Sequence, residues 1–289
     1  MINIVGCGYI GQQVALKLVQ QKLNPVAYVK TGNSLSVCQQ KNIKTELLNL
    51  DDPLCSIDIK NEKVLYLVPP QPVGDNDIRI KNFINSITGN VPEKIVLIST
   101  TGVYGDCSGD WVDESRQINP EVPRAKRRAD AEQQLIDYCE MYHVPRVVLR
   151  VPGIYGPDKL PIKRISSGEP IVREQDSPYS NRIHAHDLVN ICMEAILSDD
   201  IEGVYNCSDG NPTTMYDYFI KVSDALNIKH PPAISLQQAK QKLSAGMLSY
   251  MTESRRIDNK KLLTDFKLRL MYPDLDSGLS MIKSVCKKK

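Results

Sequence analysis

Three glycines near the start of the chain, Gly6, Gly8 and Gly11, have the spacing that binds phosphate groups. The segment reads Gly6-Cys7-Gly8-Tyr9-Ile10-Gly11. An apolar run precedes it and apolar residues at helical spacing follow it, so we expect a strand, a glycine turn and a helix. There the first glycine permits the turn, the second the approach of a pyrophosphate, and the third the contact of helix with strand. The whole segment is therefore a candidate dinucleotide site, with a plain tight turn as the alternative.

The end of the second expected strand, 25–29, bears on which dinucleotide binds. NAD sites usually place Asp or Glu about 20 residues after the glycines, where it accepts from the ribose 2′-OH. Lys30 holds that place here, and Thr31 and further small polar residues follow it. A cation with hydroxyl donors suits a 2′-phosphate. We therefore predict NADP(H) in preference to NAD(H), with a solvated surface lysine as the alternative.

The elements that must position these residues alternate along the first half of the chain. The runs 64–68 and 95–98 are almost wholly apolar, as strands buried on both faces of a parallel sheet are. A long polar helix is expected over 124–141 and a further strand from 147. The alternation predicts an α/β fold, a Rossmann-type doubly wound parallel sheet.

The pattern changes after Tyr155-Gly156-Pro157, where it becomes less regular and richer in Pro, Gly and Ser. Such a shift in composition is typical of a boundary between lobes. We expect a dinucleotide-binding domain over 1–155 and a smaller C-terminal substrate lobe over 156–289. Roughly 180–206 is expected to return to the first domain.

Four further segments carry a resemblance. Residues 99–105 read Ser-Thr-Thr-Gly-Val-Tyr-Gly, and residues 150–157 read Arg-Val-Pro-Gly-Ile-Tyr-Gly-Pro. Residues 182–188 place Arg and His ahead of Asp-Leu, and Tyr-Asn ends the run 204–206. Together these segments resemble the extended short-chain dehydrogenase/reductases, the family of sugar-nucleotide epimerases and dehydratases, and within it an atypical NAD(P)-dependent epimerase-like branch.

The resemblance implies roles for individual residues. Thr100 stands where the family has the Ser or Thr that hydrogen-bonds the reacting oxygen. Substrate contacts are implied for Thr101, Tyr104, Arg182 and His184. Cofactor contacts beyond the glycine segment, Lys30 and Thr31 are implied for Asn49, Leu50, Val68, Pro69, Arg128, Pro152, Gly153 and Ile154.

The chain departs from the family at the acid/base pair. The family uses Tyr-x-x-x-Lys, in which the lysine lowers the pKa of the tyrosine. Arg124 occupies the tyrosine position and Arg128 the lysine position. A guanidinium stays protonated at any working pH, so Arg124 cannot shuttle a proton. Arg128 could still reach the ribose or stabilise negative charge. The proton donor is left open between Tyr104, Asp75 and water.

Two kinds of function follow. The first is an NADP(H)-binding oxidoreductase or sugar-nucleotide epimerase/dehydratase-like protein that acts on a small anionic substrate. The second is a non-catalytic NADP(H)-binding module that reports redox state to a partner, which the lost tyrosine favours. The basic cluster 124–128 also raises nucleic-acid binding, but charge runs on a helix are usually solvated and acidic residues follow it, so no nucleic-acid partner is expected.

The bulk composition supports an ordinary globular protein. Hydrophobic residues make up 42% of the 289 residues and charged residues 24%, with a net charge of +2. No apolar run reaches the ~18 residues of a membrane span, so no membrane partner is expected. His184 and His186 have no evident third ligand, so no metal site is expected. The absence of a signal-like N-terminus and of paired cysteines predicts a cytoplasmic protein, and the sequence leaves a homodimer open.

Overall fold

The structure of the protein is a computed structural model that describes residues 1–243, 248 and 250–286. The chain divides into two compact units, each described by itself. Unit 1 consists of Met1–Val103, Pro120–Arg150 and Leu188–Tyr205. Unit 2 consists of Tyr104–Asn119, Val151–Asp187 and Asn206–Lys289. No helix among the described residues is long and apolar enough to cross a membrane.

Unit 1 is built on a seven-stranded sheet with the strand order β12-β7-β5-β4-β1-β2-β3. Its strands are β1 (Ile2–Val5), β2 (Val26–Val29), β3 (Lys44–Leu47), β4 (Lys63–Tyr66), β5 (Lys94–Thr100), β7 (Arg146–Val151) and β12 (Gly203–Asn206). In the parallel register around β1, Ile4 pairs with Ala27 of β2 and with Leu65 of β4. The strand order reverses between β1 and β4, which is the switch point of a doubly wound sheet. The predicted fold class is confirmed.

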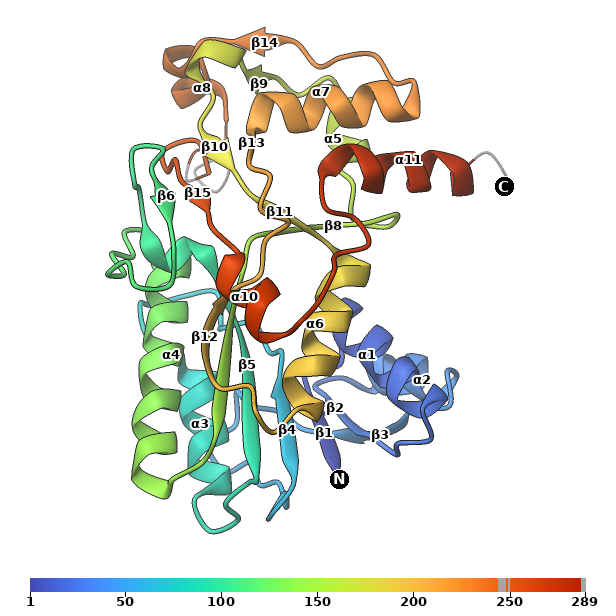
Figure 1. The fold of residues 1–289 in the computed structure, drawn as a ribbon, viewed down its shortest axis with the longest axis vertical. Helices are drawn as coiled ribbons and strands as arrows, with labels where there is room; N and C mark the ends of the chain where they lie inside the picture. The colour runs from blue at the N-terminus through green and yellow to red at the C-terminus, as the bar shows by residue number, and fades with distance from the viewer. Residues whose placement is uncertain (244–247, 249, 287–289) are drawn as a thin grey trace. The chain divides into compact units, whose positions relative to one another are not determined.

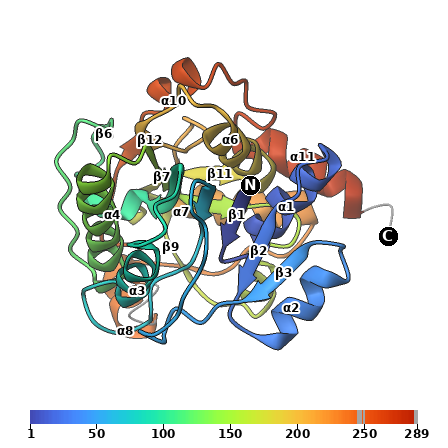
Figure 2. The same cartoon turned by 90° about the horizontal axis from the view of Figure 1, so that it is seen from below.

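Helices cover the two faces of this sheet. They are α1 (Tyr9–Gln20), α2 (Gly32–Gln39), α3 (Ile78–Ile87), α4 (Pro123–Tyr142) and α6 (Ala185–Leu197). In Figure 1, α3 and α4 lie on one face and α1 and α6 on the other, and Figure 2 shows the same layers from below. Helix α4 confirms the helix predicted over 124–141, and Pro123 begins it at a position where its missing N–H costs nothing.

The core of unit 1 lies between the sheet and the pair α3 and α4. Tyr66 of β4 and Phe83 of α3 are both fully buried, with ring centroids 5.0 Å apart. Other members of the core come from β5, α3 and α4: Ile95, Leu97, Ile80, Ile87, Ala131 and Leu135. The apolar runs that predict β4 and β5 therefore supply one wall of this core, and the faces of α3 and α4 supply the other.

Strand β5 runs past its apolar residues to Ser99 and Thr100, further than the sequence suggests. Ser99 is 3% exposed, and its hydroxyl donates to Glu132 of α4. Arg150 of β7 donates to the same carboxylate from Nη2 at 2.7 Å and from Nε at 3.2 Å. Because these buried polar groups pair with one another, a serine can continue a buried strand. The network fixes the end of β5, where Thr100 stands.

Unit 2 holds short strands and further helices. They are β6 (Trp111–Val112), β8 (Gly153–Tyr155), α5 (Ile162–Ser166), β9 (Ile171–Val172), β10 (Tyr179–Ser180), β11 (Arg182–His184), β13 (Thr213–Thr214), α7 (Met215–Leu226), β14 (Ala233–Ile234), α8 (Leu236–Lys242), β15 (Arg256–Ile257), α10 (Lys260–Asp265) and α11 (Leu275–Cys286). Its core gathers around α7 and α11, with Phe219, Leu279 and Tyr155 among the buried residues. Short 3-10 turns over Thr101–Tyr104 and Glu174–Asp176 complete the described elements.

Candidate functional site

A cavity of about 270 Å³ opens in unit 1 where several strands of the sheet end. Its lining comes from the ends of β1 and β2 and from the segments that follow β1, β2, β3 and β4. These residues are Val5, Gly6, Cys7, Gly8, Tyr28, Val29, Lys30, Ser34, Leu48, Leu50, Leu67, Val68, Pro69 and Arg79. The carboxyl ends of strands next to a switch point are where open α/β sheets bind their ligands. The cavity is therefore the candidate site.

The three glycines are needed for different structural reasons. Gly6 has a φ of +94°, and an added Cβ would stand 2.8 Å from the side chain and backbone of Val68. A Cβ on Gly11 would stand 3.0 Å from the carbonyl oxygen of Gly6. A Cβ on Gly8 would meet no atom within 4 Å, although Gly8 lines the cavity. Gly6 and Gly11 thus allow the turn and its packing, and Gly8 leaves room for a group in the cavity.

The N-terminus of α1 begins next to the open space at Gly8. Gly8 is the N-cap of α1 and has no side chain to accept from the amides of the first turn. The first turn of α1 contains no acidic residue. A helix N-terminus carries partial positive charge and amides that favour an anion. The open space at Gly8 therefore fits the pyrophosphate of a dinucleotide.

The structure places the other predicted cofactor residues unequally. Cys7, Lys30, Leu50, Val68 and Pro69 line the cavity, whereas Tyr9, Ile10 and Gly11, at the start of α1, are not part of its lining. Thr31 caps α2, and its Oγ1 accepts from the N–H of Ser34 at 3.2 Å. Asn49 accepts from the N–H of Asp51 at 3.2 Å. Thr31 and Asn49 thus order the loops beside the cavity.

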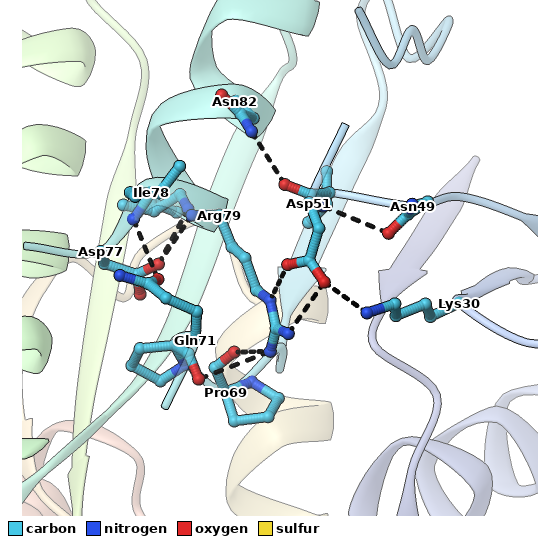
Figure 3. A network of polar contacts seen from close by, with 12 residues as sticks. Lys30, Asn49, Asp51, Pro69, Gln71, Asp77, Ile78, Arg79 and Asn82 are labelled. Atoms are coloured by element: carbon cyan, nitrogen blue, oxygen red, sulfur yellow. Dashed lines mark hydrogen bonds and ion pairs between the residues drawn. The ribbon is translucent and has the colours of Figure 1, made fainter. Parts of the chain in front are cut away.

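A carboxylate and two cations form a network at the rim of this cavity, shown in Figure 3. Arg79 donates to Asp51 from Nε at 2.5 Å and from Nη2 at 3.2 Å, and Lys30 donates to the same carboxylate. Hydrogen bonds from Arg79 and Lys30 lower the pKa of Asp51 to about 2. Lys30 and Asp51 keep 53% and 36% of their side chains exposed. The predicted cation at Lys30 is therefore present, but it already has a carboxylate partner.

Asp51 and Arg79 are not among the residues that the sequence predicts for the site. Asp51 follows the predicted Asn49-Leu50 pair directly, and this adjacency was the available signal. Arg79 carries no motif. It stands in the first turn of α3, and its Nη1 also donates to the carbonyl of Pro69 at 2.9 Å.

The basic cluster on α4 secures the loop between β4 and α3. Arg128 donates to the carbonyl of Val68 at 3.1 Å, and Arg127 donates to the carbonyl of Gly74 at 2.5 Å. Lys126 pairs with Asp75 at 3.4 Å. Arg127 is only 8% exposed. The interpretation of this cluster as a solvated charge run is thus wrong for Arg127, because its guanidinium holds a loop that lines the cavity.

The predicted catalytic residues of unit 1 are not part of the cavity lining. Thr100 is half-buried at the end of β5, and its Oγ1 accepts from the N–H of Gly102 at 3.2 Å. Arg124 and Arg128 are half-buried and stand one turn apart on α4. Burial lowers the pKa of Arg128, and the nearby Asp77 and Tyr66 oppose that shift. Thr101 is buried in the same unit and does not line the cavity either.

The remaining predicted residues lie in unit 2. Tyr104 is buried, and its hydroxyl donates to Asn206 at 2.9 Å. Gly153 of the segment Pro152–Ile154 pairs with Arg182, and a Cβ on Gly153 would stand 2.6 Å from Nη1 of Arg182. The Arg182 guanidinium is buried 4.1 Å from the ring centre of Tyr218.

His184 is buried beside aromatic rings. Its Nδ1 accepts from the N–H of His186 at 3.2 Å, and its ring centre lies 4.0 Å from that of Tyr272. Burial lowers the pKa of His184 to about 4, so the ring is neutral at pH 7. The described residues contain no group of three His, Cys, Asp or Glu side chains that could hold a metal ion.

Comparisons with known proteins show what this chain is similar to. Residues 74–208 match the model of the NAD dependent epimerase/dehydratase family. Protein YeeZ of Escherichia coli (strain K12) is 20% identical over 288 residues, which cover 94% of this chain and 96% of that protein. The resemblance to the extended short-chain dehydrogenase/reductases, with their epimerases and dehydratases, is confirmed.

Solved structures share the fold over nearly the whole chain. A conserved protein of unknown function from Silicibacter pomeroyi has a TM-score of 0.83 at 23% identity and covers 99% of both chains. UDP-glucose 4-epimerase of Thermotoga maritima, solved with UDP-glucose, has a TM-score of 0.79 at 18% identity and covers 99% of this chain and 98% of its own. At such identities the likeness concerns the fold.

Proposed function

We propose that this protein binds NADP(H) in preference to NAD(H) and acts as an oxidoreductase, epimerase or dehydratase on a small anionic substrate of the sugar-nucleotide class. The observation that carries the proposal is the cavity beside Gly6 and Gly8, with Lys30 and Arg79 at its rim. It combines open space at a helix N-terminus with cations placed for a phosphate. The family match over 74–208 supports the nicotinamide cofactor.

Different residues of unit 1 would bind different parts of the cofactor. Amides after Gly8 would hold the pyrophosphate, and Leu48 and Leu50 would pack against the adenine. Lys30 and Arg79 would bind a 2′-phosphate. Arg128, fixed on the carbonyl of Val68, would reach the ribose or stabilise negative charge. A bound nicotinamide supplies the hydride chemistry, and the protein supplies orientation.

The proposed contacts with the substrate rest on the family resemblance. Thr100 would donate to the reacting oxygen, and Arg182 would bind an anionic group of the substrate. A sugar nucleotide is favoured because a structural relative was solved with UDP-glucose. The proton donor has to be a group other than Arg124, since a guanidinium does not release its proton. Tyr104, Asp75 and water remain the candidates. The cytoplasmic location remains a prediction from the sequence, which leaves a homodimer open.

A non-catalytic NADP(H)-binding module is the second candidate, and Arg124 is the observation that favours it. Turnover assays on UDP- and dTDP-hexoses with NADP⁺ and NADPH test the two candidates. We expect slow turnover by the wild type. We expect Arg124→Tyr with Arg128→Lys to raise it by about 10²-fold or more, because a positioned acid/base contributes about 10²–10⁴-fold. Tight NADPH binding with no turnover by either protein would contradict the enzyme and leave the module.

A further inference from the structure

Asp51 lies between two cations beside the candidate cavity. Both of its carboxylate oxygens accept hydrogen bonds, one from Lys30 and both from Arg79. Lys30 and Arg79 line the cavity, and their charges face one another across this carboxylate (Figure 3). The two cations that suit a 2′-phosphate are therefore already bound to an anion that belongs to the protein.

We propose that Asp51 sets the preference between NADP(H) and NAD(H), because its carboxylate competes with the 2′-phosphate for Lys30 and Arg79. The inference rests on the proposed function, since it presumes that the cavity binds the adenosine end of a dinucleotide. A phosphate monoester carries about −1.5 to −2 charges at pH 7 and binds Arg with two parallel hydrogen bonds, as a carboxylate does. The 2′-phosphate and Asp51 thus require the same donors.

The charges at the rim give the direction of the effect. With Asp51 ionised, the two cations and the carboxylate sum to one positive charge, and without it they sum to two. Its pKa of about 2 means that the carboxylate is ionised at pH 7. NAD(H) has no phosphate at this position, so its affinity should depend little on Asp51. The carboxylate therefore lowers the ratio of NADP(H) affinity to NAD(H) affinity.

The surrounding contacts keep the rim in place when the carboxylate is removed. Arg79 Nη1 donates to the carbonyl of Pro69 at 2.9 Å, which holds the guanidinium at the cavity without Asp51. The backbone beside Asp51 is fixed by Asn82, which donates to the carbonyl of Leu50 at 2.9 Å, and by Asn49. Asp51→Asn keeps the side-chain size and one accepting oxygen. The variant should therefore fold, with its cations free for a phosphate.

The size of the effect follows from exposure. The Lys30 and Asp51 side chains remain partly in water, so each contact is screened and weak. Removing the Asp51 carboxylate releases its contacts with both Lys30 and Arg79. Together the two screened contacts correspond to roughly a tenfold change in the affinity for a 2′-phosphate. We therefore expect Asp51→Asn to raise the affinity for a 2′-phosphorylated ligand by about tenfold.

The experiment compares 2′,5′-ADP with 5′-ADP by calorimetric titration, because the two ligands differ in the 2′-phosphate and need no catalysis. Asp51→Asn should bind 2′,5′-ADP about tenfold more tightly than the wild type and 5′-ADP within about twofold. Asp52→Asn is the matched control, since Asp52 is the adjacent exposed carboxylate and accepts from the N–H of Leu54 at 2.9 Å. It should leave both affinities unchanged. Adding Lys30→Met to Asp51→Asn should reverse most of the gain.

Two results would overturn the inference alone. An unchanged ratio of the two affinities in Asp51→Asn would show that the carboxylate does not compete with the phosphate. A loss of 5′-ADP affinity would show instead that Asp51 binds the ribose itself. If neither nucleotide nor NADPH bound the wild type or Asp51→Asn, the proposed function would fail, and this inference with it.

Discussion

Gly8→Val is expected to weaken the binding of NADPH by at least about 100-fold, which corresponds to about 2.8 kcal/mol. No atom lies within 4 Å of a Cβ added at Gly8, so the new side chain enters the space that the pyrophosphate needs. Gly8 has a φ of −85° and a ψ of −148°, and this ψ lies outside the usual β region, so a valine there also strains the backbone. Together with the poorer N-cap, this strain should lower the free energy of unfolding by about 1–3 kcal/mol, so the affinity is measured at a temperature at which the variant is folded.

Two other glycines make this experiment selective. Gly89→Val is the matched control, because a Cβ at Gly89 also meets open space and Gly89 does not line the cavity. It should leave NADPH affinity unchanged in a calorimetric titration. Gly6→Ala should instead unfold the protein more readily, since its φ of +94° and the 2.8 Å approach to Val68 both penalise a side chain. NADPH affinity within about threefold of the wild type in Gly8→Val would contradict the placement of the pyrophosphate.

Glu132→Ala is expected to lower the free energy of unfolding by about 3–5 kcal/mol. Glu132 and Arg150 keep only 3% and 8% of their side chains exposed, and Nη2 of Arg150 donates to Glu132 at 2.7 Å. The alanine leaves the guanidinium charged, buried and without this carboxylate. Ser99 loses its acceptor as well. Denaturant unfolding at pH 7 measures the loss.

A double variant separates the pair from the packing around it. Glu132→Met with Arg150→Met removes both charges at similar volume, and such replacements are often neutral or stabilising. It should recover most of the loss seen in Glu132→Ala. A loss below about 1 kcal/mol in Glu132→Ala would mean that the ion pair contributes no more than an exposed one does.

The sequence predicts the site best where a local pattern determines it. The glycine spacing depends on a turn of six residues and on the helix that follows. The roles of Gly6, Gly8 and Gly11 can therefore be predicted without knowledge of the fold. The apolar runs of β4 and β5 and the long helix α4 are also local patterns. The structure confirms these elements, with boundaries that shift by a few residues.

The sequence predicts poorly what depends on partners distant in the chain. Asp51, which follows β3, and Arg79, in the first turn of α3, form an ion pair only in the folded chain, and no spacing encodes that pair. Arg127 reads as a surface charge, although its acceptor is the carbonyl of Gly74. Ser99 reads as the end of a strand, because its buried acceptor on α4 is invisible in the sequence. In each case a tertiary contact reverses the local expectation.

The central claim is that unit 1 binds NADP(H) in the cavity beside Gly8. The most direct measurement is the thermal and denaturant unfolding of the wild type with increasing NADPH or NADH. A ligand that binds only the native state adds about 2.7 kcal/mol of stability at 100 times its dissociation constant. We predict that NADPH reaches this stabilisation at a lower concentration than NADH. A greater effect of NADH would contradict the preference assigned to Lys30 and Arg79, and no stabilisation by either ligand would contradict the site itself.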